Sequence, residues 1–276
     1  MSYKSRKQFF YGIIYLVIFG LIGAGIYFAL TSKEATCFDG IQNQNEEGVD
    51  CGGPCQSSCE HLTIRDIEVK KVNLIPAGNL TYDLAAQIEN PNPNFGLSDL
   101  DYSFRMYDAA GELVKEQKGS EFILPGETKY LVEANIQTQK PVSRAEIILK
   151  KPENSKWKKF GAVSNSNLFI KDKKINFLEN SFNGWEATGV LKNNGDFSFE
   201  EIFVSVILFI AAGDPIAAGK TLLNTVNKGE ERYFSIRWTE RAGLNINSME
   251  MRAETNLLSN ENFLRQSGET EKFQEY

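Results

Sequence analysis

A pattern of strand and turn signals occurs twice in this chain, about one hundred residues apart. The stretch "YSFRMYDAAGELV" matches "FVSVILFIAAGDPI", and "LPGETKYLVEANI" matches "NKGEERYFSIRW". Three landmarks recur 102 or 103 positions later, as the pairs Asn90 and Asn193, Gly111 and Gly213, and Gly126 and Gly229. Solenoid units are shorter, at roughly 20–50 residues. The sequence therefore predicts a duplicated domain rather than a solenoid.

Within each copy the apolar residues alternate, which predicts half-buried strands. Leu100, Tyr102, Phe104 and Met106 follow this period of two, and a Pro-Gly turn comes later. Short strands separated by frequent turn signals are typical of all-β sandwiches. We expect an all-β fold with two tandem immunoglobulin-like β-sandwiches. The predicted segments are sandwiches at 61–152 and 165–258, a linker at 153–164 and a polar C-terminal tail at 259–276.

The motifs "SFRMYDAAG" and "LPGE" resemble the FxLYD-type and related immunoglobulin-like domains of bacterial surface proteins. Their signature is an alternating strand that ends in Tyr-Asp, a glycine turn, and then a Pro-Gly-Glu turn. The second copy departs from it, because "ILFIAAG" lacks Tyr-Asp and Lys228 replaces the proline. The resemblance implies the fold and no binding function. Neither copy contains cysteine, so each core depends on apolar burial.

The segment at 9–30, FFYGIIYLVIFGLIGAGIYFAL, contains no charged side chain. At about 1.5 Å per residue, a helix of this length spans the roughly 30 Å hydrocarbon core of a membrane. A cleaved signal peptide is the alternative, but "YFALTSKEA" is a poor cleavage site. We expect an uncleaved transmembrane helix, with a cytoplasmic N-terminus at 1–8 and an extracytoplasmic part at 31–276. The positive residues that predict this orientation are Lys4, Arg6 and Lys7.

The predicted anchor carries small residues four positions apart, a spacing that lets two membrane helices approach closely. Weak self-association through Gly20, Ala24, Gly25 and Ala29 is the corresponding prediction. The alternative is that the spacing arises by chance, since pairs of small residues are common in apolar segments.

All four cysteines lie in a predicted neck module at 31–60. Thiols oxidise outside the cytoplasm, so Cys37, Cys51, Cys55 and Cys59 predict two disulfides, with three pairings open. Zinc is the alternative, but structural zinc sites use closely spaced cysteine pairs separated by a longer loop, which this spacing does not match. The stretches "DGIQN" and "GVDCGG" resemble a short module of bacterial surface proteins. That resemblance implies an exported protein and no activity.

The loop between the first two cysteines is rich in oxygen-bearing side chains. A weak calcium site would use Asp39, Asn43, Asn45, Glu47 and Asp50. The EF-hand pattern is absent, since the glycine and the final glutamate do not fall at the required offsets. A solvated turn-rich loop is the simpler interpretation.

Composition and motifs argue against several function classes. The net charge is −6, which does not indicate a nucleic-acid-binding surface. His61 is the single histidine, and neither H-E-x-x-H nor G-x-S-x-G occurs. The stretch "GDPIAAGKT" has Asp214 where a P-loop requires glycine, so it predicts a hairpin. We expect no catalytic site, no cofactor and no nucleic-acid partner.

The function that these features indicate is that of a non-enzymatic, single-pass membrane-anchored protein with a structural, adhesive or envelope-complex role. Its partners would be the membrane and a protein of the cell envelope. The alternative is a surface sensor or carrier that binds Ca²⁺ or glycan through the neck or the sandwich tips. An enzyme is the third hypothesis, and the sequence gives it the least support.

Overall fold

The computed structural model divides the chain into two compact units, Met1–Thr63 and Ile64–Tyr276, which we describe separately. The described residues are 14–23, 36–37, 41–43, 45–46, 48–49, 51–55, 59, 64–153, 156–159, 166–179, 183–239, 241 and 243–264. Statements about structure below refer to these residues.

In the first unit, residues 14–23 form a helix whose apolar side chains are exposed, among them Leu16 and Phe19. Among the described residues, no helix has both the length and the apolar character that a membrane crossing needs. The rest of the predicted span, at 9–13 and 24–30, lies outside the described residues. Gly20 belongs to the described helix, whereas Ala24, Gly25 and Ala29 lie outside the described part. The transmembrane helix therefore stays a prediction.

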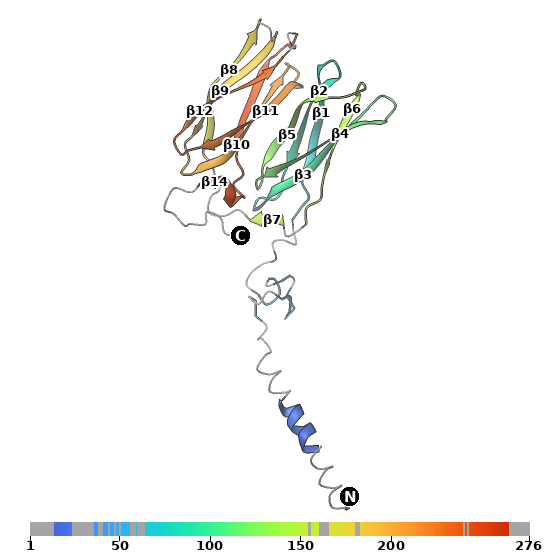
Figure 1. The fold of residues 1–276 in the computed structure, drawn as a ribbon, viewed down its shortest axis with the longest axis vertical. Coiled ribbons are helices and arrows are strands. Elements are labelled where there is room, and N and C mark those ends of the chain that lie inside the picture. The colour runs from blue at the N-terminus through green and yellow to red at the C-terminus, as the bar shows by residue number, and fades with distance from the viewer. Residues whose placement is uncertain are drawn as a thin grey trace, which may run out of the picture. The chain divides into compact units, whose positions relative to one another are not determined.

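The second unit contains four antiparallel sheets arranged as two β-sandwiches (Figure 1). In the first sandwich, one sheet has the order β1-β2-β5 and the other the order β4-β3-β6, and β7 also pairs with β3. The strands are β1 (Glu68–Gly78), β2 (Thr81–Glu89), β3 (Phe95–Tyr107), β4 (Leu113–Ile123), β5 (Thr128–Gln137), β6 (Arg144–Leu149) and β7 (Trp157–Lys159).

The core of the first sandwich follows from the alternation that the sequence shows in β3. Leu100, Tyr102, Phe104 and Met106 are each at most 4% exposed and pack together with residues of the facing sheet such as Leu84. The residues between them are polar and only partly buried. The prediction of an all-β fold with two sandwiches is confirmed at this level.

The second sandwich repeats the first strand for strand. Its sheets have the orders β12-β9-β8 and β11-β10-β13, and β14 also pairs with β10. The elements are β8 (Leu168–Leu178), β9 (Gly184–Asn193), β10 (Ser198–Phe209), β11 (Pro215–Val226), β12 (Glu231–Trp238), β13 (Ser248–Glu254), a 3-10 turn η3 (Asn260–Asn262) and β14 (Phe263–Leu264).

The landmark asparagines make equivalent side-chain hydrogen bonds in the two copies. Asn90 is buried, and its Nδ2 donates hydrogen bonds to the carbonyls of Phe95 and Leu124. The Nδ2 of Asn193, also buried, donates to the carbonyl of Phe197 at the equivalent place. Each amide therefore ties the loop after the second strand of a copy to the third strand, which explains why the residue occurs in both copies.

The landmark glycines also occupy matching turns. Gly111 and Gly213 both have φ 83°, and Gly126 and Gly229 have φ 64° and 76°. Residues with side chains rarely adopt this left-handed conformation. The turn signals read from the sequence are therefore backbone requirements of one hairpin in each copy, and of one turn that connects the two sheets of that copy.

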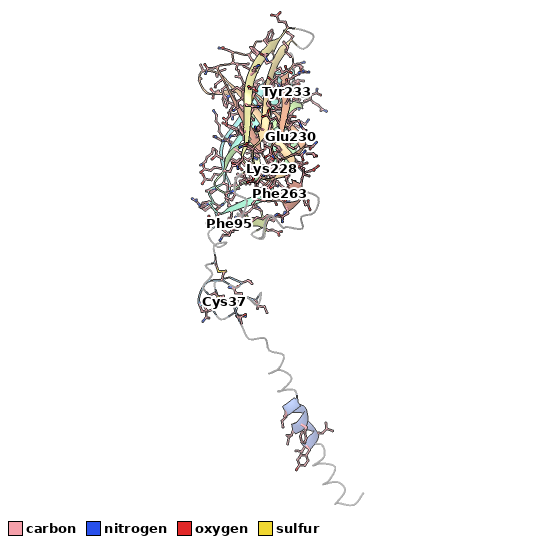
Figure 2. All side chains as sticks on the ribbon, turned by 90° about the vertical axis from the view of Figure 1, so that its left-hand side faces the viewer. Cys37, Phe95, Lys228, Glu230, Tyr233 and Phe263 are labelled. Atoms are coloured by element: carbon pink, nitrogen blue, oxygen red, sulfur yellow. A yellow bond between two sulfur atoms is a disulfide. The ribbon has the colours of Figure 1, made fainter. Side chains whose placement is uncertain are left out.

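Two segments that the sequence predicts as linker and tail add strands to the sandwiches. Trp157 of β7 is 6% exposed and pairs with Leu97, and Phe263 of β14 is 4% exposed and pairs with Phe199. In each case a single aromatic side chain enters the core and brings a polar segment into the sheet. Figure 2 shows Phe95 of β3, which pairs with Lys159 of β7, and Phe263 of β14. Both lie at the same end of this unit.

Candidate functional site

The two sandwiches contact each other through one sheet of each, β1-β2-β5 of the first and β11-β10-β13 of the second. Strand β11 contacts all three strands of the facing sheet, and Figure 1 shows the two sandwiches side by side. Asp214, just before β11, pairs with Lys71 of β1, the Ala218 N–H donates to Asp83 of β2, and Lys220 pairs with Glu133 of β5. We call this contact the inter-sandwich interface.

A small apolar cluster lies at the centre of the inter-sandwich interface. It consists of Ile75, Ala85, Val132, Ile207 and Ala218, each at most 2% exposed. These side chains point away from the cores of their own sandwiches, so the middle strands β2 and β10 are buried on both faces at this point. Removal of this apolar surface from water stabilises the contact.

The duplication shows that these residues are specific to the interface. Ala85 pairs across the strands with Val132, and the equivalent pair in the second copy is Thr188 with Ser235. Ile207 pairs with Ala218, and the equivalent pair in the first copy is Arg105 with Glu116. The outward positions are thus apolar where the copies meet and polar at the equivalent places. Sequence reasoning missed this signal, which was available by aligning the two copies.

A buried ion pair lies beside the apolar cluster. The guanidinium of Arg241, in the loop after β12, donates to both carboxylate oxygens of Asp83, from Nη1 at 2.5 Å and from Nη2 at 3.0 Å. Asp83 also accepts the backbone N–H groups of Asn135 and Ala218. Arg241 Nε donates to the carbonyl of Ala77. The charges are therefore compensated and hydrogen-bonded, as burial requires.

A second charged cluster surrounds Lys129, whose side chain is 1% exposed. Its Nζ lies 2.9 Å from Oε2 of Glu254 in the other sandwich and 3.9 Å from Oε1 of Glu121. The same Nζ donates to the carbonyl of Phe122 and lies 3.9 Å from the centre of that ring. A lysine was not expected in the core from sequence, because lysine is almost never fully buried unless it is paired.

The pKa values of this cluster follow from burial and from the charges. Burial alone would lower the pKa of Lys129, but the carboxylates of Glu254, Glu121 and Glu127 outweigh it and raise that pKa. Burial raises the pKa of Glu121, against the opposing effect of Lys129. Burial also raises the pKa of Glu127, in the turn before β5. The carboxylates thus stabilise the charged form of Lys129, and burial makes ionisation of the two glutamates less favourable than in water.

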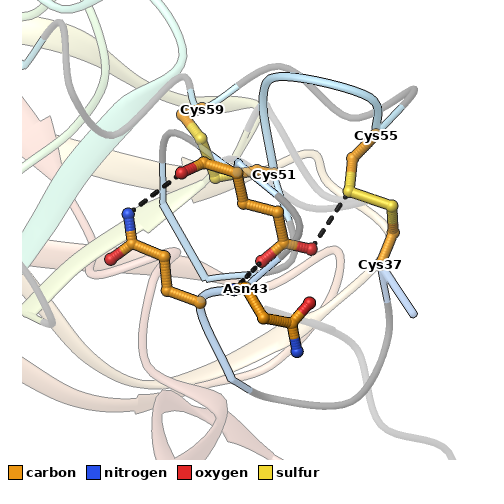
Figure 3. Close-up of a disulfide and its surroundings, with 7 residues drawn as sticks. Cys37, Asn43, Cys51, Cys55 and Cys59 are labelled. Atoms are coloured by element: carbon orange, nitrogen blue, oxygen red, sulfur yellow. Dashed lines mark hydrogen bonds between the residues drawn. A yellow bond between two sulfur atoms is a disulfide. The ribbon is translucent and has the colours of Figure 1, made fainter. Parts of the chain in front are cut away.

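In the neck, the four cysteines form two disulfides, Cys37–Cys55 and Cys51–Cys59 (Figure 3). The predicted disulfides are therefore confirmed. Among the three pairings that the sequence left open, the structure has the one that joins the first cysteine to the third and the second to the fourth. Zinc would need thiolates, and no described cysteine is free.

The glycines of the neck are explained by close contacts. An added Cβ at Gly53 would lie 2.2 Å from the carbonyl oxygen of Asn45, and Gly53 has φ +57°. A Cβ at Gly48 would lie 2.9 Å from Sγ of Cys51 and 3.1 Å from Sγ of Cys59. These approaches favour glycine, which accounts for Gly48 and Gly53 of the "GVDCGG" motif on packing grounds.

One acidic side chain of the neck is internal. Glu46 is 6% exposed, and its Oε2 accepts the backbone N–H of Asn43. Its Oε1 lies 3.1 Å from Sγ of Cys55, a contact drawn in Figure 3. Glu46 with Cys37 and Cys55 is close enough in space to suggest metal ligands, but both sulfurs belong to a disulfide. Glu46 therefore has a structural role in this module.

The predicted calcium site is only partly described. Asn43 and Asn45 belong to the described residues, and Asn45 has φ 64°. The three carboxylates that would supply the charge, Asp39, Glu47 and Asp50, lie outside the described residues. Calcium binding therefore stays a hypothesis.

The hollows on the described surface of the sandwich unit include two larger ones. One, of about 430 Å³, lies between β8 and β13 and is lined by the opposite charges of Lys173, Arg252, Glu127 and Glu254. The other, of about 320 Å³, lies over Gly119, where Lys150 pairs with Asp101. The residues that line them contain no histidine or cysteine. The Ser103 hydroxyl, which lines the second hollow, donates to Glu116 Oε1 at 2.6 Å in an exposed contact.

The P-loop-like stretch is a hairpin. Asp214 lies in the turn between β10 and β11, where the Ile210 N–H donates to its carbonyl. Lys220 and Thr221 are residues of β11, so no helix N-terminus follows the turn. A nucleotide phosphate therefore has no cradle here. His61 lies outside the described residues.

Comparisons with known proteins identify no family. No family model matches the chain, and no curated protein matches it. Among solved structures, a crystal structure of red sea bream transglutaminase is similar, with a TM-score of 0.22 and 8% sequence identity. The match covers 68% of this chain and 30% of that one. A similarity at this level carries no argument about fold or function.

Proposed function

We propose that this chain is a non-enzymatic, single-pass membrane-anchored protein whose two sandwiches form a rigid extracytoplasmic head. Its role would be structural or adhesive, or that of a subunit in a complex of the cell envelope. The resemblance of its strand and turn motifs to bacterial surface domains supports the fold of this head. The oxidised neck supports a location outside the cytoplasm, because disulfides persist in oxidising compartments.

The observation that carries the proposal is the inter-sandwich interface. Domains joined only by a linker move relative to one another unless their interface is large and apolar. Here an apolar cluster and two buried charge clusters join the sandwiches, around Asp83 with Arg241 and around Lys129 with Glu254. A head joined in this way holds the surfaces of its two sandwiches in a fixed arrangement, which suits a structural or adhesive component.

The proposal of a membrane anchor is supported by the sequence and by the short described helix. Residues 14–23 expose apolar side chains in the described part, which suits a lipid environment better than water. Lys4, Arg6 and Lys7 supply the positive charges that favour a cytoplasmic N-terminus.

A topology experiment tests the proposal directly. A reporter enzyme that is active only outside the cytoplasm would be fused after Tyr276 in the full chain, and a second reporter that is active only inside would be fused in parallel. We expect activity from the first fusion alone. The matched control replaces Lys4, Arg6 and Lys7 with glutamate, which should reduce the outside signal. Activity from the inside reporter alone would refute the proposed location.

The partner is tested by crosslinking in intact cells followed by affinity capture of the full chain. A structural or adhesive role predicts one or a few envelope proteins in stoichiometric yield. The control is Arg241→Met, which should loosen the head without altering the anchor, and which should reduce capture if the partner needs the rigid head. Capture that is equal for both chains would show that the partner does not need the rigid head.

A further inference from the structure

The hairpin between β1 and β2 carries the single Asn-x-Ser/Thr triplet of the whole sequence, Asn79-Leu80-Thr81. Such a triplet is the acceptor signal for N-linked oligosaccharides in exported proteins, provided that the middle residue is not proline. A triplet alone is a weak signal, because it also occurs by chance. The structural position of this one gives it further weight.

Asn79 is exposed at the tip of a turn that other contacts hold in place. Gly78 pairs across the hairpin with Thr81, so Asn79 and Leu80 are the two turn residues. The carbonyl of Leu80 accepts hydrogen bonds from the backbone N–H of Thr138 at 2.8 Å and from its hydroxyl at 3.1 Å. These bonds fix the inner side of the turn and leave Asn79 on the outer side.

The side-chain amide of Asn79 is uncommitted. In the described part of the chain, no hydrogen bond engages it, whereas Asn90, Asn193 and Asn262 are buried and use their amides to hold loops together. The hydroxyl of Thr81 lies beside it and donates to the carbonyl of Asn79 at 3.2 Å. Both residues that the acceptor signal requires therefore lie together at an accessible tip.

The turn also lies at the end of the first sandwich remote from β7. Strand β2 begins at Thr81 and ends at Glu89, and the loop after it leads to Phe95, which pairs with Lys159 of β7. Asn79 is therefore separated from the end where β7 and β14 join the sheets. The inter-sandwich contact nearest to this tip is that of Arg241 with the Ala77 carbonyl, and Asn79 stays exposed beside it.

We propose that Asn79 is an acceptor site for an N-linked oligosaccharide. The donor class is an oligosaccharide linked to a lipid phosphate or diphosphate, and a transferase of the host supplies the catalysis. The Nδ2 of Asn79 forms a bond to the anomeric carbon of the sugar, and the bond from that carbon to the phosphate oxygen breaks. The phosphate leaves with the bonding electron pair, and one amide proton passes to a base. The inference rests on the proposed extracytoplasmic location.

The test is the intact mass of the full chain, purified from cells whose exported proteins receive glycans at Asn-x-Thr. The chain would also carry an added Asn-Ala-Thr tag after Tyr276, which reports on location independently. We expect mass increments at both sites. Enzymatic removal of the glycan should leave aspartate at position 79, about 1 dalton heavier than asparagine. Asn79→Gln and Thr81→Ala should each remove one increment, whereas Thr81→Ser should retain it.

The possible outcomes separate this inference from the proposed function. A modified tag with an unmodified Asn79 overturns the acceptor site and leaves the proposed location intact. Two unmodified sites show that the C-terminal part does not reach the outside, which overturns the location and the acceptor site together. An increment that persists in Asn79→Gln also overturns the assignment, because another residue must then carry it.

Discussion

The carboxylate of Asp83 and the guanidinium of Arg241 form a bidentate ion pair between the two sandwiches, although 158 residues separate them in the chain. Their side chains are 0% and 4% exposed. Each charge has lost its water and depends on the other for compensation. Such a pair contributes little net stability compared with an apolar contact, but removal of one partner is costly. The pair therefore makes the folding of each sandwich sensitive to the other.

The first prediction follows from this difference between the small net stability of the ion pair and the large cost of removing one partner. Arg241→Met leaves the Asp83 carboxylate buried without its partner, so we expect a loss of about 3–5 kcal/mol in the free energy of unfolding, measured with urea. Arg105→Met is the control, since Arg105 pairs with Glu116 at an outward position of the first sandwich that no second sheet covers, and is 40% exposed. That control should change stability little. If Arg241→Met lowers the free energy of unfolding no more than Arg105→Met does, the result would contradict a buried ion pair at the inter-sandwich interface.

The second prediction uses equivalent residues of the two copies. Val132→Ser puts a hydroxyl into the apolar cluster, and we expect a loss of about 1–3 kcal/mol, because that hydroxyl gains no partner among the apolar residues around it. Ser235→Val is the matched control at the equivalent position, where we expect a change within about 0.5 kcal/mol.

The number of steps in the unfolding transition is the second readout of this experiment. Both sandwiches should unfold in one cooperative step, and Val132→Ser should lower the midpoint of that single step. Two separate transitions in the unsubstituted protein would show that the sandwiches are energetically independent.

The sandwich architecture could be predicted from sequence because its signals are local. Alternation such as Leu100, Tyr102 and Phe104 marks strands with one core face. Glycines such as Gly111 and Gly213 mark turns whose backbone needs positive φ. The cysteine cluster predicted the disulfides for a similar reason, since all four thiols lie close together in the chain. These signals depend on near neighbours, which a sequence displays directly.

The inter-sandwich interface could not be predicted in the same way because burial there is non-local. Ala85 and Ala218 are small residues at outward positions, and nothing near them in sequence says that another sheet covers them. Lys129 is a lysine in an alternating strand and is typical of an exposed position, yet Glu254 compensates its charge from the other sandwich. The disulfide pairing was undetermined for the related reason that spacing does not fix which sulfurs meet.

The third prediction concerns pH and again compares equivalent positions. Burial raises the pKa of Glu127 above its ordinary value of 4.5, whereas the backbone N–H of Asn227, followed by Arg232, lowers the pKa of Glu230 below the same value. Both carboxylates accept a backbone N–H in the same turn, from Leu124 and from Asn227. The two positions therefore differ mainly in what covers them.

The signs of their contributions are opposite. A raised pKa favours the protonated folded state, so the contribution of Glu127 is present below pH 4.5 and is lost as pH rises through its folded pKa. A lowered pKa favours the charged folded state, so the contribution of Glu230 is present above pH 4.5 and is lost as pH falls through its folded pKa.

Glutamine at each position isolates these effects. At about pH 7 we expect Glu127→Gln to raise the free energy of unfolding and Glu230→Gln to lower it, with both differences shrinking in acid. The measurement is urea unfolding at a series of pH values. The effect at Glu230 should be the smaller one, because its side chain is 25% exposed and solvent screens it. The same sign at both positions would show that coverage by the second sandwich does not control the titration of Glu127.

The last prediction returns to the neck. Peptide mapping without reduction should recover Cys37 linked to Cys55 and Cys51 linked to Cys59, and the intact mass should be about 4 daltons below the all-thiol value. The links span 18 and 8 residues. Chain-entropy estimates for loops of this size give roughly 3 and 2.5 kcal/mol. A polar segment this short buries little apolar surface, so these links should decide whether it is ordered.

Two changes should therefore loosen the neck and leave the sandwiches unaffected. Reduction should make residues 37–59 sensitive to protease while the melting temperature of the sandwiches stays constant, because neither core contains cysteine. Gly53→Ala should have the same effect without reduction, since its Cβ would meet the carbonyl of Asn45 at 2.2 Å. Gly243→Ala is the control, where a Cβ meets nothing within 4 Å. Protease resistance of Gly53→Ala equal to that of the control would show that the disulfides alone, and not this close approach, set the conformation of the module.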